Sequence, residues 1–231
     1  MGYLGYKPAD KPLTSADITD GIITSAKIAD GTIVNADINA SAAIDASKLT
    51  GLSSDYVLLA TTTASSSSAV SFDGYFSSTY SNYQIHFYNL DFSTQTDLLV
   101  RFRIANADVT SSNYKYGTLS NPYFDENGSG NGTQINNSWS STHIKLNNND
   151  LGTGVGDYVT QGILYLQNPL SSSNYKMCMG DFAYMATALN IMKRESFVGS
   201  LQSATTALSG ITFYPGSGNI VTGIFKLYGI K

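Results

Sequence analysis

The sequence holds little charge and almost no cysteine, and each shortage excludes a class of protein. Only 13% of the 231 residues are charged, against roughly 25% in an ordinary globular protein. The single cysteine, Cys178, rules out a disulfide framework within the chain and a cysteine-based zinc site. The formal net charge of −4 lacks the basic face that a nucleic-acid binder needs. No apolar run approaches the ~18 residues of a membrane span. We therefore expect no nucleic-acid partner and no membrane insertion.

Side chains suited to catalysis are also scarce. His86 and His143 are the only histidines, and neither has the sequence context of a catalytic base. Glu126 and Glu195 are the only glutamates, and no pair of carboxylates stands out as suited to glycoside hydrolysis. The glycine-rich run at 152–157 lacks the Gly-Lys-Ser/Thr ending of a phosphate loop. We therefore expect a protein that is not an enzyme, with no catalytic residue, no cofactor and no metal site.

The chain is rich in residues that form strands. It has 16 Tyr and 10 Phe among abundant Ser, Thr, Asn and Gly, and this composition favours strands and turns over helices. Apolar residues alternate with polar ones at 83–87 and at 98–104, as in half-buried strands. Candidate strands lie at 56–60, 69–72, 83–92, 97–105, 114–118, 143–146, 161–167, 175–185, 191–201, 207–214 and 220–230. We predict a mainly β fold in which residues 53–231 form an antiparallel β-sandwich of jelly-roll type, with an exposed loop at 120–142.

The first fifty residues are organised differently, because they repeat. The polar tetrads that begin at Ser15, Ser25 and Asn35 are three copies of one pattern, spaced by ten. A period of five fits neither a helix nor a simple strand, and repetition at a fixed period is typical of an elongated, stacked architecture. Large apolar residues recur every five positions, with one extra residue before the last two: Leu13, Ile18, Ile23, Ile28, Ile33, Ile38, Ile44 and Leu49.

One chain of this repeat cannot bury enough apolar surface to offset the entropy lost on ordering it. Three chains wound around a common axis could place each isoleucine ring in a shared core. We therefore predict that residues 13–52 form the stalk of a homotrimer, with the leucine and isoleucine series as its core. The alternative interpretation is a flexible linker that happens to repeat.

Aromatic residues gather in or near the predicted loop at 120–142. Aromatic rings stack on the faces of sugars, while Asn and Ser side chains supply hydrogen bonds. Loops rich in Tyr, Ser, Gly and Asn are also effective protein-binding surfaces. The candidates for receptor binding are Tyr114, Tyr116, Tyr123, Phe124 and Trp139.

Three segments together resemble a short fibre or appendage protein of a tailed bacteriophage, especially of marine phages. The opening Met1-Gly2-Tyr3-Leu4-Gly5 resembles the start of virion-attached fibres, the repeat at 13–49 resembles their stalks, and the ending at 223–230 resembles the last strand of their β heads. The resemblance implies a homotrimer in the virion. Residues 1–12 would dock on another virion protein, while residues 53–231 would adhere to a host surface glycan or protein. The residues of this virion anchor would be Met1, Gly2, Tyr3, Leu4, Gly5 and Tyr6.

A trimeric tail fibre is the first hypothesis for the function. A fibre that decorates the capsid has the same architecture and stays open as an alternative. A small polysaccharide-degrading tailspike is a third hypothesis, although such enzymes usually have a longer β-helical body. Because the N-terminus lacks the apolar core of a signal peptide, we expect the protein to be made in the host cytoplasm and to be found in the virion.

Overall fold

The computed structural model describes residues 14–39, 41–45, 54–120, 123–124, 130–131, 134–148, 151, 160–186, 191–203 and 205–231. The chain forms two compact units, Met1–Ser53 and Ser54–Lys231. The N-terminal anchor residues 1–6, together with Leu13 and Leu49 of the apolar series, lie outside the described residues.

The first unit repeats a single-turn 3-10 helix at intervals of ten residues. The three turns are η1 (Ser15–Asp17), η2 (Ser25–Lys27) and η3 (Asn35–Asp37). In each, the last residue donates its backbone N–H to the carbonyl three residues earlier, at 3.0, 2.9 and 2.9 Å. The carboxylate of Asp17 accepts from the backbone N–H of Thr14 at 2.8 Å. The three copies of the polar tetrad thus adopt one local structure.

A second turn completes the ten-residue repeat. The N–H of Ile22 donates to the carbonyl of Thr19 at 3.2 Å, and the N–H of Thr32 donates to that of Ala29 at 3.1 Å. Glycines sit inside these turns with φ of +80° and +79°, a left-handed backbone that glycine adopts at little steric cost. An apolar residue follows each of the two kinds of turn, which explains the five-residue spacing of the series.

All residues of 14–45 whose burial is described are exposed. The apolar series is no exception, since its described members keep between 38% and 54% of their surface in contact with solvent: Ile18, Ile23, Ile28, Ile33, Ile38 and Ile44. A single copy of the chain therefore leaves this series without an apolar environment.

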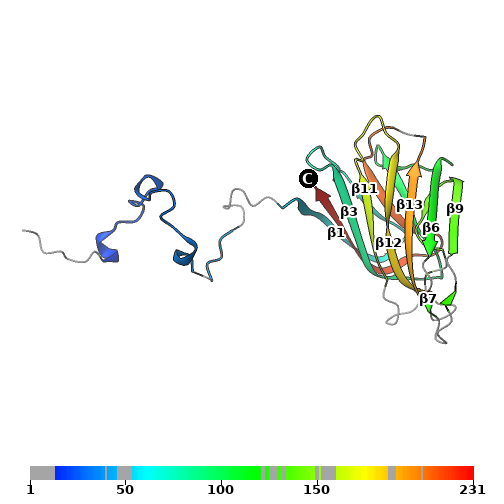
Figure 1. The fold of residues 1–231 in the computed structure, drawn as a ribbon, viewed down its shortest axis with the longest axis horizontal. Helices are drawn as coiled ribbons and strands as arrows, with labels where there is room; N and C mark the ends of the chain where they lie inside the picture. The colour runs from blue at the N-terminus through cyan, green and yellow to red at the C-terminus, as the bar shows by residue number, and fades with distance from the viewer. Residues whose placement is uncertain are drawn as a thin grey trace, which may run out of the picture. The chain divides into compact units, whose positions relative to one another are not determined.

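The second unit is built on an eight-stranded antiparallel sheet, whose strands run side by side across Figure 1. In spatial order they are β1 (Tyr56–Ser67), β15 (Ile220–Ile230), β3 (Asn82–Phe92), β11 (Gln161–Gln167), β12 (Lys176–Ala186), β13 (Ile191–Leu201), β6 (Tyr114–Ser120) and β9 (Gln134–Ser141).

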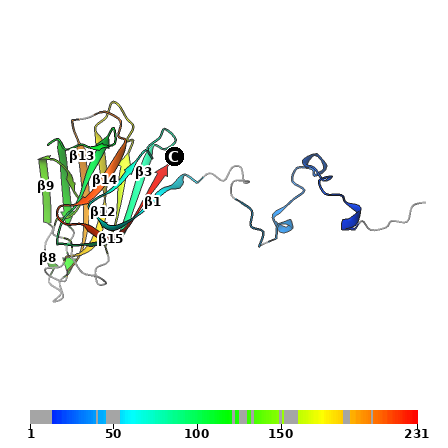
Figure 2. The same ribbon diagram turned by 180° about the vertical axis from the view of Figure 1, so that it is seen from behind.

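A second antiparallel sheet lies behind the first, and Figure 2 shows its strand β14 from that side. Its strands in order are β10 (Ile144–Lys145), β4 (Leu98–Ile104), β14 (Gly210–Pro215) and β2 (Val70–Asp73), with β5 (Ala107–Asp108) paired to β4. The short strands β7 (Tyr123–Phe124) and β8 (Gly130–Asn131) pair with each other. The prediction of a mainly β fold with antiparallel sheets is confirmed.

The hydrophobic core lies between the two large sheets. Phe87 of β3 and Phe213 of β14 come from different sheets, and their ring centroids are 5.7 Å apart. The alternation predicted for β3 is present, because Tyr83, Ile85 and Phe87 are all fully buried. Cys178 is likewise buried and acts as a small apolar core residue.

The prediction of one long loop at 120–142 is wrong in part. Residues Gln134–Ser141 form β9, which pairs with β6 in a register that places Ile135 opposite Leu119. This strand is an edge of the sheet, so only one of its sides needs backbone partners. Its many Asn and Ser residues hide the apolar alternation by which strands are usually recognised.

Candidate functional site

The face of the eight-stranded sheet that points away from the core carries many exposed apolar side chains. Contiguous exposed apolar surface on a soluble domain often marks an interaction site. On this face such side chains are 40% to 76% exposed: Leu119, Ile135, Trp139, Tyr165, Met177, Met179 and Val198.

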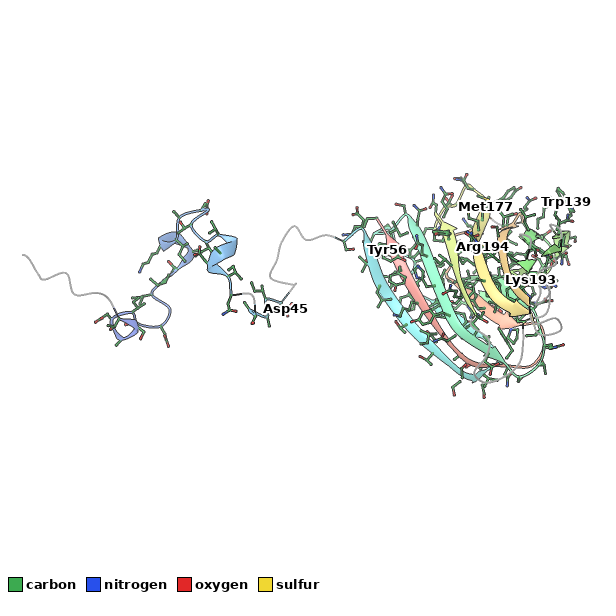
Figure 3. The ribbon with its side chains drawn as sticks, turned by 60° about the horizontal axis from the view of Figure 1, so that its bottom comes forward. Asp45, Tyr56, Trp139, Met177, Lys193 and Arg194 are labelled. Carbon is green, nitrogen blue, oxygen red and sulfur yellow. The ribbon has the colours of Figure 1, made fainter. Side chains whose placement is uncertain are left out.

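A groove of about 340 Å³ lies at the β9 side of this face. Figure 3 labels two of its residues: Trp139 lies on β9, the edge strand farthest from Tyr56 of β1, and Met177 lies on β12 between them. Its lining combines an aromatic ring, an ammonium group, amides, a hydroxyl group and a thioether, from Trp139, Lys115, Asn137, Gln202, Ser200 and Met177.

Trp139 is the only tryptophan of the chain and is 76% exposed. The pairing of β9 with β6 is irregular between Tyr114 and Tyr116, where Ser141 and Ser138 are the partners. An irregularity of this kind can re-aim a side chain. The ammonium group of Lys115 lies 5.1 Å from the centroid of the Trp139 ring, a cation–π contact that helps to fix the ring's position.

Gly117 keeps the floor of the groove low. A Cβ atom built at this position would meet only a methyl group of Val198, at 3.9 Å. A larger residue would therefore fit the strand and project into the groove. This glycine leaves room beside the tryptophan ring that any other residue would reduce.

The groove suits a ligand with both an apolar face and several hydroxyl or amide groups. The indole ring can stack on the C–H face of a pyranose, while Asn137, Gln202 and Ser200 can donate and accept hydrogen bonds. Peptide segments offer similar groups, and exposed aromatic residues are enriched where proteins bind each other. Both classes match the expected host surface glycan or protein.

Of the five predicted receptor-binding residues, the three whose side chains the structure describes have different environments. Tyr114 is fully buried, and its hydroxyl group accepts from the N–H of Phe102 at 2.9 Å, so its role is in the core. Burial also raises the pKa of the Tyr114 hydroxyl group. Tyr116 is half-buried, with its ring 6.2 Å from that of His143. The side chains of Tyr123 and Phe124 lie outside the described residues.

A second group of aromatic and polar side chains lies near the β1 edge of the same face. The hydroxyl group of Tyr56 donates to Oε1 of Gln84 at 2.7 Å and lies 2.6 Å from Nε2 of His86. The rings of Tyr56 and Tyr228 stack with centroids 4.5 Å apart. Four side chains from three adjacent strands thereby hold one another in place.

The two histidines predict a loss of stability on mild acidification. Burial is the main reason that the pKa of His86 and that of His143 lie below the ordinary value of 6.5, with Lys226 and Arg101 as the next causes. The folded state therefore binds fewer protons than the unfolded state below this value, and stability falls as the pH decreases. Urea unfolding at about pH 7.5 and about pH 5.5 should show a larger loss for the wild type than for His86→Gln. Equal losses would contradict this assignment for His86.

A buried carboxylate ties together the other end of the sheet. Glu195 is fully buried, and its Oε1 accepts from the hydroxyl groups of Ser120 at 2.6 Å and Tyr184 at 2.7 Å. Its Oε2 accepts from the N–H of Asn148 at 2.5 Å. Burial raises the pKa of Glu195, whereas these hydrogen bonds lower it. The contacts of Glu195 are those of a structural anchor.

Comparisons with protein-family models, with curated proteins and with solved structures find no match. Among the described residues, no group of three or more His, Cys, Asp or Glu side chains is placed to hold a metal ion. Within the same residues, no helix has the length and apolar character that a membrane span requires.

Proposed function

We propose that this protein is a trimeric virion fibre of a tailed bacteriophage, most simply a tail fibre, which attaches to the host surface through its β head. The observation that carries the proposal is the isoleucine series. Five of its described members, from Ile18 to Ile38, follow two alternating kinds of turn, and all six are at least 38% exposed in a single chain. Exposed isoleucines at a fixed spacing are explained when further copies of the chain bury them.

The division of the chain supports an adhesive role. Residues 13–52 supply the stalk and residues 53–231 supply a jelly-roll head, while the resemblance assigns residues 1–12 to docking on another virion protein. The groove beside Trp139 gives the head a surface with aromatic, amide and hydroxyl groups. These groups suit a host surface glycan.

The single tryptophan allows a direct test of adhesion. Trp139 lies in the groove, so a ligand bound there should shift its fluorescence and shield it from quenching by acrylamide. The probes are lipopolysaccharide, peptidoglycan fragments and capsular polysaccharide, titrated into the full chain. We expect at least one of them to protect the tryptophan.

Filling the groove should weaken the binding that protects Trp139. Gly117→Leu places a side chain on the groove floor, and we expect it to weaken binding roughly tenfold or more, which corresponds to about 1.4 kcal/mol. Tyr75→Ala is the matched control, because this exposed tyrosine packs against Phe72 of the other sheet. If no probe protects Trp139, or if Gly117→Leu binds as the wild type does, the groove is not the adhesive site.

A further inference from the structure

The β1 half of the outer face carries an unbroken row of uncharged side chains. The register places Leu58 of β1 opposite Tyr228 of β15, which lies opposite Gln84 of β3. Gln84 in turn lies opposite Tyr165 of β11, and Tyr165 lies opposite Met179 of β12. Five adjacent strands thus contribute one residue each, and none of the five carries a charge. Leu58, Tyr165 and Met179 are 50%, 41% and 48% exposed.

Two members of this row, Tyr228 and Gln84, are held in place by neighbouring side chains. Tyr56 stacks on Tyr228, and its hydroxyl group is held by Gln84 and His86. Side chains that are already fixed lose little conformational entropy when a partner covers them. Depletion of charge together with enrichment in Tyr and Met is typical of the fully buried centre of a protein–protein interface.

We infer that two further copies of this chain cover the β1 half of the outer face, so that the row from Leu58 to Met179 lies within the contact. The inference rests on the proposed trimer and adds the surface through which the heads meet. The chain runs from the repeat into β1, which begins at Tyr56. Three chains joined through residues 13–52 would therefore bring three copies of β1 together at high effective concentration.

The assignment divides the outer face between two roles. Copies of the chain cover the outward side chains of β1, β15, β3 and β11 and Met179 of β12, whereas Met177, Ile135 and Trp139 stay accessible. The groove beside Trp139 then remains open to a ligand in the assembled protein. A threefold ring of copies permits this when each head meets its two neighbours through two different patches that both lie within this half of the face.

Thiol labelling of the full chain measures this burial directly. Cys178 supplies little background, because it is buried and burial raises its pKa to about 12. The test position is Leu58→Cys and the control is Ile135→Cys, which are both exposed in a single chain. In the assembled protein, we expect a charged maleimide to label Leu58→Cys at least ~10-fold more slowly than Ile135→Cys.

A second variant tests whether the slow labelling of Leu58→Cys depends on the contact between copies. Adding Tyr165→Glu to Leu58→Cys places a carboxylate within the contact and should restore fast labelling while the stalk keeps the copies together. Adding Tyr165→Phe should preserve the protection.

Three outcomes would overturn the inference. If Leu58→Cys and Ile135→Cys react equally fast in a protein of trimeric mass, the protein is a trimer but its copies do not cover the β1 half of the outer face. A protein of monomeric mass removes the trimer and this interface together. Protection of Leu58→Cys that requires an added glycan would make the face a ligand site instead.

Discussion

Replacing Ile28 and Ile33 with aspartate is expected to reduce the assembled protein to single chains. Both side chains belong to the series that three chains would bury, so the double variant would place six carboxylates near the axis. An unpaired buried charge is far more costly than an exposed one. The mass in solution should fall to that of one chain, 24.7 kDa, at micromolar concentration.

A matched variant keeps the test specific to charge. Ile28→Val and Ile33→Val preserve the apolar β-branched shape, and this double variant should keep the mass of the wild type. The head should remain folded in the aspartate variant, because residues Ser54–Lys231 form a separate compact unit. Near-ultraviolet circular dichroism of the tyrosines reports this. An aspartate variant that stays fully trimeric would show that the repeat is not the core of the assembly.

Glu195→Ala is expected to destabilise the head strongly. The carboxylate accepts hydrogen bonds from Ser120, Tyr184 and the backbone of Asn148, so its removal takes one acceptor from three separate segments. Loss of such a buried network costs about 2–4 kcal/mol. The melting temperature of the head should fall by roughly 4–16 °C, given about 2–4 °C per kcal/mol for a domain of this size.

Glu195→Gln is the control for this effect, because it keeps the volume and one oxygen acceptor. We expect it to lie between the wild type and Glu195→Ala. Thermal unfolding followed by tyrosine circular dichroism compares the three proteins. An alanine variant that melts with the wild type would show that the three hydrogen bonds contribute nothing measurable to the stability of the head.

Strands whose apolar residues alternate could be predicted from the sequence. The segments 161–167, 191–201 and 220–230 coincide with β11, β13 and β15, because each is a run of β-forming residues between turn-forming ones. The edge strand β9 could not be recognised, since its pairing with β6 depends on backbone hydrogen bonds that polar residues make equally well. The repeat at 13–49 predicted a regular structure but not its content of two alternating turns.

The sequence predicts only some of the residues that line the candidate groove. The Asn-, Ser- and Gly-rich segment around Trp139 predicts its exposure, and the structure leaves it exposed. Lys115, Met177 and Gln202 are far away in sequence, and only the register of β12, β13, β6 and β9 brings them to one groove. Tyr114 and Tyr116 follow each other at a spacing of two, yet the sequence does not reveal that this side of β6 faces the core.

The mass of the purified full chain in solution, measured by light scattering, tests the central claim most directly. A homotrimer has three times the chain mass of 24.7 kDa, or about 74 kDa, and the value should not change on dilution through the micromolar range. A mass of 24.7 kDa at every concentration would contradict the claim. The exposed isoleucines would then have no partner in further copies of the chain, and the repeat would be a linker.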